Sequence, residues 1–271
     1  MRLLILLVAM AAFALAPRAV AQDAETEKAI EKYRAMLRED PWSNPGFLDV
    51  DRGEALWATA RGPNNVSLEQ CDLGKGPGKV DGAFAELPRY FPDADRVMDL
   101  ETRLLHCMTT LQGRSRDEAT KRVFGNENQP SEMEYLSAYV ASQSRGVKLA
   151  AGNSHPKEKE AYELGKALFF HRAGGWDMSC ASCHGEDNKR IRMQDLPVLY
   201  KPQSARPIMA TWPAYRVSNS QFKTMQWRLN NCYQQMRYPE PNYASDLTVA
   251  LTLFLTATGE GEPYRGPGTK R

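Results

Sequence analysis

The sequence lacks the marks of a membrane or nucleic-acid protein. Its 271 residues carry 35 Lys and Arg against 33 Asp and Glu, so no basic footprint for nucleic acid is present. Beyond the start of the chain, no apolar run approaches the roughly 20 residues that span a bilayer. Hydrophobic residues make up 42% and charged residues 25%, which excludes a disordered or collagen-like chain. We expect a soluble globular protein with no membrane span and no nucleic-acid partner.

The first 21 residues have the layout of a secretory signal peptide. Arg2 gives a basic start, residues 3–16 are apolar, and residues 19–21 form a small-x-small site before Gln22. A membrane anchor would need a longer apolar run. We therefore predict an exported protein that is cleaved near Ala21 and matures in the bacterial periplasm, where cysteine pairs can persist as disulfides.

Three short stretches of the mature chain recur in the same order. Residues 53–57 (GEALW) match residues 165–169 (GKALF), and Cys71 matches Cys183 at the same offset of 112 residues. Residues 103–107 (RLLHC) match residues 228–232 (RLNNC) at an offset of 125. Ordered matches of this kind indicate two related domains. We place them at residues 22–150 and 151–271, with the boundary in the stretch 146–156.

Periodicity predicts that both domains are mainly α-helical. Two stripes at helical spacing carry a cysteine on their apolar face, namely Val97, Leu100, Leu104, Cys107 and Leu111, and Phe222, Met225, Leu229, Cys232 and Met236. Further apolar stripes predict helices around residues 133–140, 161–168 and 247–254, the last ending at Gly259. Long loops rich in Pro and Gly are expected at residues 75–82 and 196–213.

Residues 180–184 (CASCH) carry the attachment signature of c-type haem. Two thiols at this spacing can each add to one vinyl group of a porphyrin, and His184 can then bind the iron. A thioredoxin-type pair would need a βαβ context, and a zinc site would need a second cysteine pair, and the sequence offers neither. We predict one covalently bound haem c, held by Cys180 and Cys183 and ligated by His184.

The sixth iron ligand has several candidates. Met193, Met209, Met225, Met236, His155 and His171 all qualify by residue type. Cys232 is a sharper candidate, because it lies on an apolar stripe after the haem motif. Arg228 precedes it by four residues, so one helix face presents a thiol and a guanidinium that favours thiolate and suits an oxyanion. Trp227 and Arg237 flank this pair, but an inert buried thiol remains the alternative.

These features in combination resemble the SoxA family, the catalytic subunits of the SoxAX cytochromes of bacterial sulfur oxidation. The resemblance rests on Cys71, residues 99–103 (DLETR), Cys107, residues 180–184 (CASCH) and residues 228–232 (RLNNC). It covers nearly the whole mature chain. It implies two cytochrome c-like domains and an L-cysteine S-thiosulfotransferase that joins thiosulfate to a cysteine of the carrier protein SoxYZ. The two electrons released would pass through haem to a small partner cytochrome, SoxX.

The resemblance also implies roles for single residues. Cys232 would be the distal thiolate or persulfide ligand of the iron and the active-site cysteine, and Arg228 would bind the thiosulfate anion. Some relatives carry a second haem in the first domain, but Cys71 stands there alone with no following His. A Cys71–Cys107 disulfide is expected in its place.

Two other functions compete with this one. A periplasmic electron-transfer cytochrome c would use a Met ligand and make no bonds. A two-domain haem peroxidase would carry two C-x-x-C-H motifs, whereas this sequence has one.

Overall fold

The structure is a computed structural model. It describes residues 44–117, 131–191 and 194–270, together with 24–26, 28–29, 31–33 and 35–36. Residues 45–271 form one compact unit, and the residues before it form another. The described residues between 24 and 36 are helical, and the predicted signal peptide, residues 1–21, lies outside the described residues.

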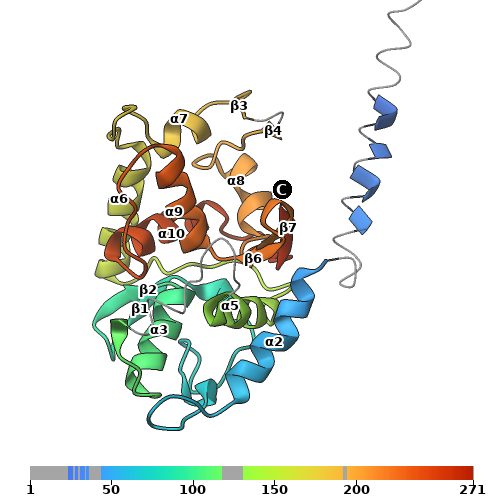
Figure 1. Ribbon diagram of the computed structural model, residues 1–271. Helices are drawn as coiled ribbons and strands as arrows, with labels where there is room; N and C mark the ends of the chain where they lie inside the picture. Colours follow the sequence, from blue (N-terminus) through green and yellow to red (C-terminus); the bar gives the residue numbers. More distant parts are fainter. Residues whose placement is uncertain are drawn as a thin grey trace, which may run out of the picture. The chain divides into compact units, whose positions relative to one another are not determined.

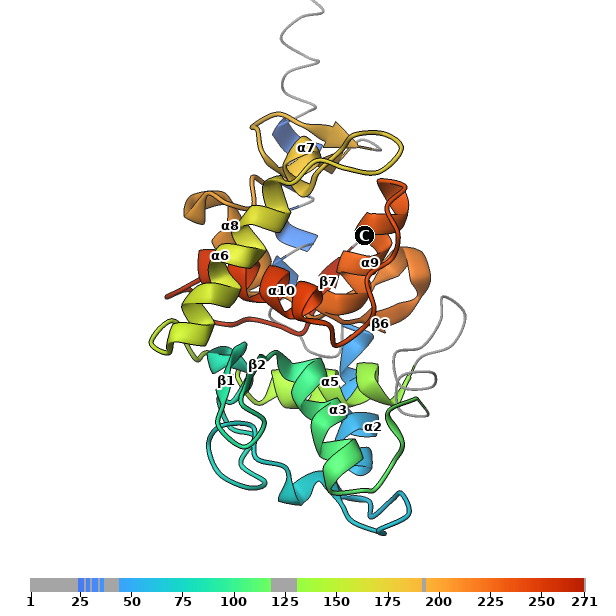
Figure 2. The same cartoon turned by 90° about the vertical axis from the view of Figure 1, so that its left-hand side faces the viewer.

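The compact unit is mainly helical, with short strands (Figures 1 and 2). Its α-helices are α2 (Gly46–Ala58), α3 (Leu100–Thr110), α5 (Glu132–Ser142), α6 (Pro156–Phe170), α7 (Cys180–His184), α8 (Pro202–Met209), α9 (Met225–Gln235) and α10 (Asp246–Thr258). Its strands are β1 (Arg89–Phe91), β2 (Arg96–Met98), β3 (Arg190–Ile191), β4 (Gln194–Asp195), β5 (Ala214–Arg216), β6 (Gln221–Lys223) and β7 (Gly268–Lys270). Single 3-10 turns lie at η2 (Leu68–Gln70), η3 (Phe84–Glu86) and η4 (Val217–Asn219).

Within the described residues, the two larger of three hydrophobic cores define a first lobe, residues 45–145, and a second lobe, residues 146–270, while the third joins Val97 of the first lobe to Val249 and Leu253 of the second. The first core is built around Trp57, Leu104 and Leu136, and the second around Phe169 and Phe254. In both views α7 lies at the end of the second lobe that is remote from the first lobe (Figures 1 and 2). The haem motif is therefore held by the second core alone.

Each lobe contains a pair of helices that cross at a glycine. Helix α2 packs on α5 and helix α6 packs on α10. A Cβ atom at Gly53 would overlap the carbonyl of Tyr135, and a Cβ at Gly165 would overlap the carbonyl of Ala250. Only glycine lets the backbones approach this closely. The recurring glycine of the sequence thus has the same structural task in both lobes.

Each lobe also contains an antiparallel hairpin that leads into a helix. Strands β1 and β2 precede α3, and β5 and β6 precede α9, while β7 adds a parallel strand to β5. The Asp99 carboxylate caps α3 by accepting from Thr102 N at 2.9 Å, and the Thr224 hydroxyl caps α9 by accepting from Trp227 N at 3.2 Å. The two cysteine-bearing helices therefore start from equivalent positions.

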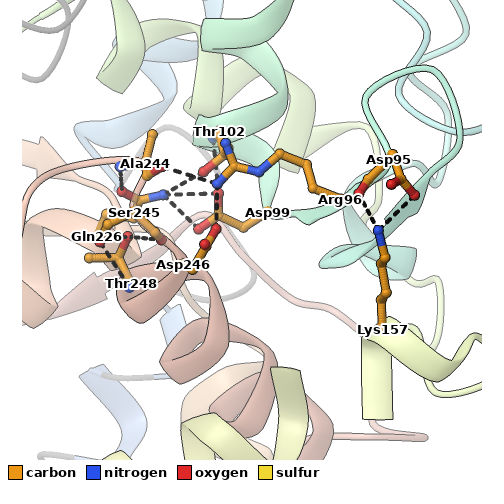
Figure 3. Close-up of polar contacts among 10 residues, drawn as sticks. All are labelled: Asp95, Arg96, Asp99, Thr102, Lys157, Gln226, Ala244, Ser245, Asp246 and Thr248. Atoms are coloured by element: carbon orange, nitrogen blue, oxygen red, sulfur yellow. Dashed lines mark hydrogen bonds and ion pairs between the residues drawn. The ribbon is translucent and has the colours of Figure 1, made fainter. Parts of the chain in front are cut away.

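Buried polar contacts join the lobes at these helix starts (Figure 3). Gln226 Nε2 donates to both carboxylate oxygens of Asp99 at 2.7 and 2.9 Å, and its Oε1 accepts from Ala244 N at 2.7 Å. A second contact is the ion pair of Lys223 Nζ with Glu134 Oε1 at 2.7 Å, whose side chains are 0% and 1% exposed. Because buried polar groups are costly when unpaired, these contacts fix α9 against the first lobe.

Three details of the predicted helices are wrong. The expected loop 196–213 contains α8, which tolerates Pro202 because a first-turn residue needs no N–H bond. The predicted stripe of α6 includes Leu164, yet this residue is 45% exposed, because Gly165 gives α6 its contact with α10. The stripes that begin at Val97 and Phe222 start in strands, and the helices begin three residues later.

Candidate functional site

Helix α7 presents the two cysteines of the C-x-x-C-H motif. It begins at a capping box in which Ser182 N donates to Ser179 Oγ at 3.2 Å and Ser179 N donates to Ser182 Oγ at 2.9 Å. Residues three apart in a helix are neighbours on its surface, so Cys180 and Cys183 lie side by side. Both thiols are free and partly buried.

His184 is held in the tautomer that a metal ligand requires. Its Nδ1 lies 2.9 Å from the carbonyl oxygen of Pro197. Because a carbonyl can only accept, Nδ1 carries the proton, and the lone pair of Nε2 is left for a metal. Burial lowers the pKa of His184, the bond to Pro197 opposes this shift, and the charge of Arg228 adds to it. The net direction keeps the imidazole neutral.

Helix α9 brings a third thiol to this motif. Cys232 is free and partly buried. Burial, together with negative charge on Cys232, raises the pKa of Cys180 to about 12. Burial also raises the pKa of Cys183, again with a contribution from Cys232. The structure therefore brings Cys232 close to the two thiols of the motif, although about 50 residues separate it from them in the sequence.

Arg228 lies one helical turn before Cys232 and has an oriented guanidinium. Its Nη1 donates to Asn231 Oδ1 at 2.9 Å, and the same oxygen accepts from Gln235 Nε2 at 2.8 Å. Within the described part of the chain, no carboxylate forms an ion pair with Arg228. Burial raises the pKa of Cys183 and the charge of Arg228 opposes this rise, whereas for His184 burial lowers the pKa and the charge of Arg228 adds to the lowering. A partly buried cation without an acidic partner is suited to an anionic ligand.

The residues at this site fit a covalently bound haem c. They supply two free thiols at the required spacing, an imidazole with an available Nε2, and a further thiol. Cys180 and Ala181 of α7 pack against the second hydrophobic core, as do the partly buried apolar side chains of Met178 before the motif and Leu199 after it. An apolar seat of this kind suits a porphyrin ring.

Three of the other candidate ligands have structural roles of their own. Met209 and Met236 are buried in the second core. His155 caps α6 by accepting from Lys157 N at 3.2 Å, and its ring stacks on Tyr90 with centroids 3.7 Å apart. Met225 and His171 lie at the start of α9 and at the end of α6. Met193 is outside the described residues.

Comparison with known proteins identifies the family. The profile of the SoxA/TsdA cytochrome c domain matches residues 52–149. The L-cysteine S-thiosulfotransferase subunit SoxA of Hydrogenophilus thermoluteolus is 50% identical over 98% of this chain and 97% of its own length. The chain belongs to the SoxA family. A SoxA of Hydrogenobacter thermophilus is 33% identical over 93% of this chain and 92% of its own length.

The fold agrees with this assignment. The crystal structure of SoxXA from P. pantotrophus superposes with a TM-score of 0.72 and 25% identity, covering 89% of this chain and 84% of that one. SoxA membership places the chain among the L-cysteine S-thiosulfotransferase subunits and makes it a cytochrome c-type protein. No described helix is long and apolar enough to cross a membrane.

The first lobe has a different arrangement at the residues whose sequence matches Cys183, Arg228 and Cys232. A disulfide joins Cys71 and Cys107, the pair that the resemblance implied, with Cα atoms 5.7 Å apart. Arg103, the counterpart of Arg228, is only 5% exposed and pairs with Asp93 at 2.7 Å. Its guanidinium also lies over the ring of Phe91 at 4.2 Å. In the first lobe, therefore, cysteine and arginine side chains make contacts that hold the fold together.

Two residues of the SoxA site were not singled out by sequence reasoning. Asn231 orients Arg228, and the helical spacing of three residues was a usable signal for it. Pro197 accepts the proton of His184 from a loop that follows the haem motif. No local pattern in the sequence indicates that contact.

Proposed function

We propose that this chain joins thiosulfate oxidatively to a cysteine of the carrier protein SoxYZ. Cys180 and Cys183 would attach one haem c, His184 would bind its iron on one side, and Cys232 would bind on the other. Cys232 would also be the active-site cysteine, and Arg228 would bind the substrate. The observation that carries this proposal is a free thiol, Cys232, with an oriented guanidinium one helical turn before it, both close enough to the haem motif for their charges to shift the pKa values of its residues.

Arg228 would bind thiosulfate before any bond forms. Thiosulfate is a dianion, and a guanidinium can donate two parallel hydrogen bonds to its oxygens. Asn231 Oδ1 accepts a hydrogen bond from the guanidinium, so the cation is oriented before the substrate arrives. The negative sulfonate end would then lie at Arg228, with the outer sulfur directed to Cys232.

Cys232 would divide the oxidation into two steps. In the first step, the Cys232 thiolate and the outer sulfur of thiosulfate form an S–S bond and give up two electrons. In the second step, the carrier thiolate attacks that outer sulfur, and Cys232 leaves as thiolate. The sum is thiosulfate dianion plus carrier thiolate giving a carrier S-thiosulfonate monoanion and two electrons, so charge and atoms balance.

The electrons need an acceptor next to Cys232 and a route out of the protein. Haem c supplies one-electron redox chemistry when it is bound. We infer that SoxX is the partner that takes the electrons, since the structural relative is a SoxXA complex. Export to the periplasm, with cleavage after residue 21, fits both the disulfide and covalent haem attachment.

We also infer that the two lobes belong to duplicated cytochrome c-like domains, which we place at residues 22–150 and 151–271. Support comes from the paired glycine crossings, from the two hairpins that lead into capped helices, and from the family profile on residues 52–149. The profile covers the lobe without C-x-x-C-H, so that lobe has kept its fold after losing the haem signature.

The test is Cys232→Ala in the haem-loaded protein bound to its partner cytochrome. Covalent haem should remain, the haem absorption spectrum should change, and thiosulfate-dependent turnover should disappear. Retained turnover would refute the catalytic role of Cys232. An unaltered spectrum would favour an electron-transfer cytochrome with a Met ligand.

A further inference from the structure

A short strap after α9 holds the loop that leads into the haem motif. The strap begins at Arg237, whose φ of 58° turns the chain, and continues with Tyr238. Tyr238 N donates to Tyr233 O at 2.9 Å, and the two rings meet edge to face with centroids 5.1 Å apart. The ring of Tyr238 is therefore fixed to the last turn of the helix that carries Cys232.

The hydroxyl of Tyr238 reaches a loop about 60 residues earlier in the chain. It hydrogen-bonds the carbonyl of Met178 and lies 3.0 Å from the carbonyl of His171. The same ring covers Gly174, where a Cβ atom would overlap it. Met178 O also accepts from Ala173 N at 3.0 Å, which closes the loop. One phenol thus pins both ends and the tip of residues 171–178.

The pinned loop ends directly at the haem motif. Met178 precedes Ser179, the residue that caps α7, and Cys180 is the first residue of that helix. Tyr238 lies six residues after Cys232, beyond the end of α9. The hydroxyl therefore links the helix that holds the attachment cysteines and His184 to the helix that holds Cys232.

The first lobe contains the equivalent contact with different chemistry. Gln112 Nε2 donates to Val66 O at 3.0 Å, and Val66 corresponds to Met178 at the offset of 112 residues. In that lobe, the Cys71–Cys107 disulfide joins the same two segments covalently. In the second lobe no disulfide joins the cysteines of α7 and α9. There the Tyr238 hydroxyl supplies a direct hydrogen-bonded link between these segments.

We propose that Tyr238 is a positioning residue that holds Cys232 within reach of the haem iron. The proposal rests on the proposed function, because it takes Cys232 as the distal ligand. Without the hydroxyl, α9 and the 171–178 loop can separate, and Cys232 then binds the iron for a smaller share of the time. The contact acts through Cys232 and does not touch the reacting atoms.

The test is Tyr238→Phe in the full haem-loaded protein. This variant keeps the ring against Tyr233 and Gly174 and removes only the donor. One neutral hydrogen bond corresponds to about a five-fold change in an equilibrium, so we expect the ratio of thiolate-ligated to unligated ferric haem to fall about five-fold. Electron paramagnetic resonance of the ferric protein, far below its unfolding temperature, measures this ratio.

Two reference variants make the result decisive. Gln112→Met removes the equivalent donor in the first lobe, and it should lower the unfolding temperature without moving the haem signal. Cys232→Ala gives the signal of haem that lacks the thiolate. An unaltered ligation ratio in Tyr238→Phe would overturn the proposal if Cys232→Ala changes the signal. An unaltered signal in Cys232→Ala would instead overturn the proposed ligand itself.

Discussion

The two lobes carry the same residue types at positions that match in sequence, but the side chains there have different partners. In the first lobe Cys71 and Cys107 are joined, and Arg103 is neutralised by Asp93. In the second lobe the equivalent cysteines are free, and Arg228 is oriented by a neutral amide. A cysteine and an arginine one turn apart are therefore no sign of a site by themselves. Whether such a pair forms a functional site depends on the groups that the two side chains contact.

The largest effect that separates the lobes is expected from the arginines. Arg228→Gln removes the charge that would bind thiosulfate. Because hydrogen bonds to charged groups contribute more free energy than neutral ones, kcat/KM should fall by about 10- to 100-fold. Arg103→Gln, its first-lobe counterpart, should lower stability and leave kcat/KM nearly unaltered. Steady-state kinetics with thiosulfate and carrier measures both. Equal losses of kcat/KM in the two variants would break the comparison.

The next effect concerns the disulfide. Cys71→Ala combined with Cys107→Ala opens a link across a sequence separation of 36 residues. On the chain-entropy estimate, the free energy of unfolding should fall by about 3–4 kcal/mol. Because α7 and α9 belong to the other lobe, the haem absorption spectrum should not change. Denaturant unfolding followed by circular dichroism measures the loss, and a shifted haem spectrum would show that the lobes are not independent in this respect.

The smallest effect arises where the lobes meet. Glu101 is 4% exposed, and burial together with the Asp99 carboxylate raises its pKa from 4.5 to about 8. The folded protein then keeps a proton that the unfolded chain releases between these pH values. The free energy of unfolding should therefore fall as pH rises through that window. Glu101→Gln should flatten this fall, because an amide does not titrate, while its oxygen can still accept from Gln226 N and keep the contact between the lobes.

Denaturant melts at several pH values test the effect of Glu101. Glu160→Gln, which changes an exposed carboxylate, is the matched control and should leave the slope in place. If Glu101→Gln also leaves the slope in place, the carboxyl is not the source of the pH dependence.

The sequence predicted the helices whose apolar residues recur at helical spacing. The helices predicted around residues 133–140 and 247–254 are confirmed by α5 and α10, and α10 ends at Gly259 as expected. The hairpins before α3 and α9 were not predicted, because strands of three residues have too few positions to show alternation of apolar and polar side chains. The exposure of Leu164 was not predicted, because the contact of α6 with α10 is made at Gly165, and a glycine contributes nothing to a hydrophobic pattern.

The site divides in the same way. Cys180, Cys183, His184, Arg228 and Cys232 could be named because their spacing carries chemistry. The contact of Gln226 with Asp99 joins residues 127 positions apart, and no local pattern encodes such a pair. The bond from Tyr238 to the loop before α7 depends on the folded path of the chain in the same way. Contacts of this kind follow from packing and emerge only with the structure.

The central claim is that equivalent cysteines form a disulfide in one lobe and remain apart in the other, where they serve haem and chemistry. Peptide mapping of the purified haem-loaded protein by mass spectrometry, without reduction, tests it directly. We expect one haem on the peptide with Cys180 and Cys183, a Cys71–Cys107 link, and Cys232 outside any disulfide, as free thiol or with added sulfur. A link between Cys71 and Cys232 would contradict the claim.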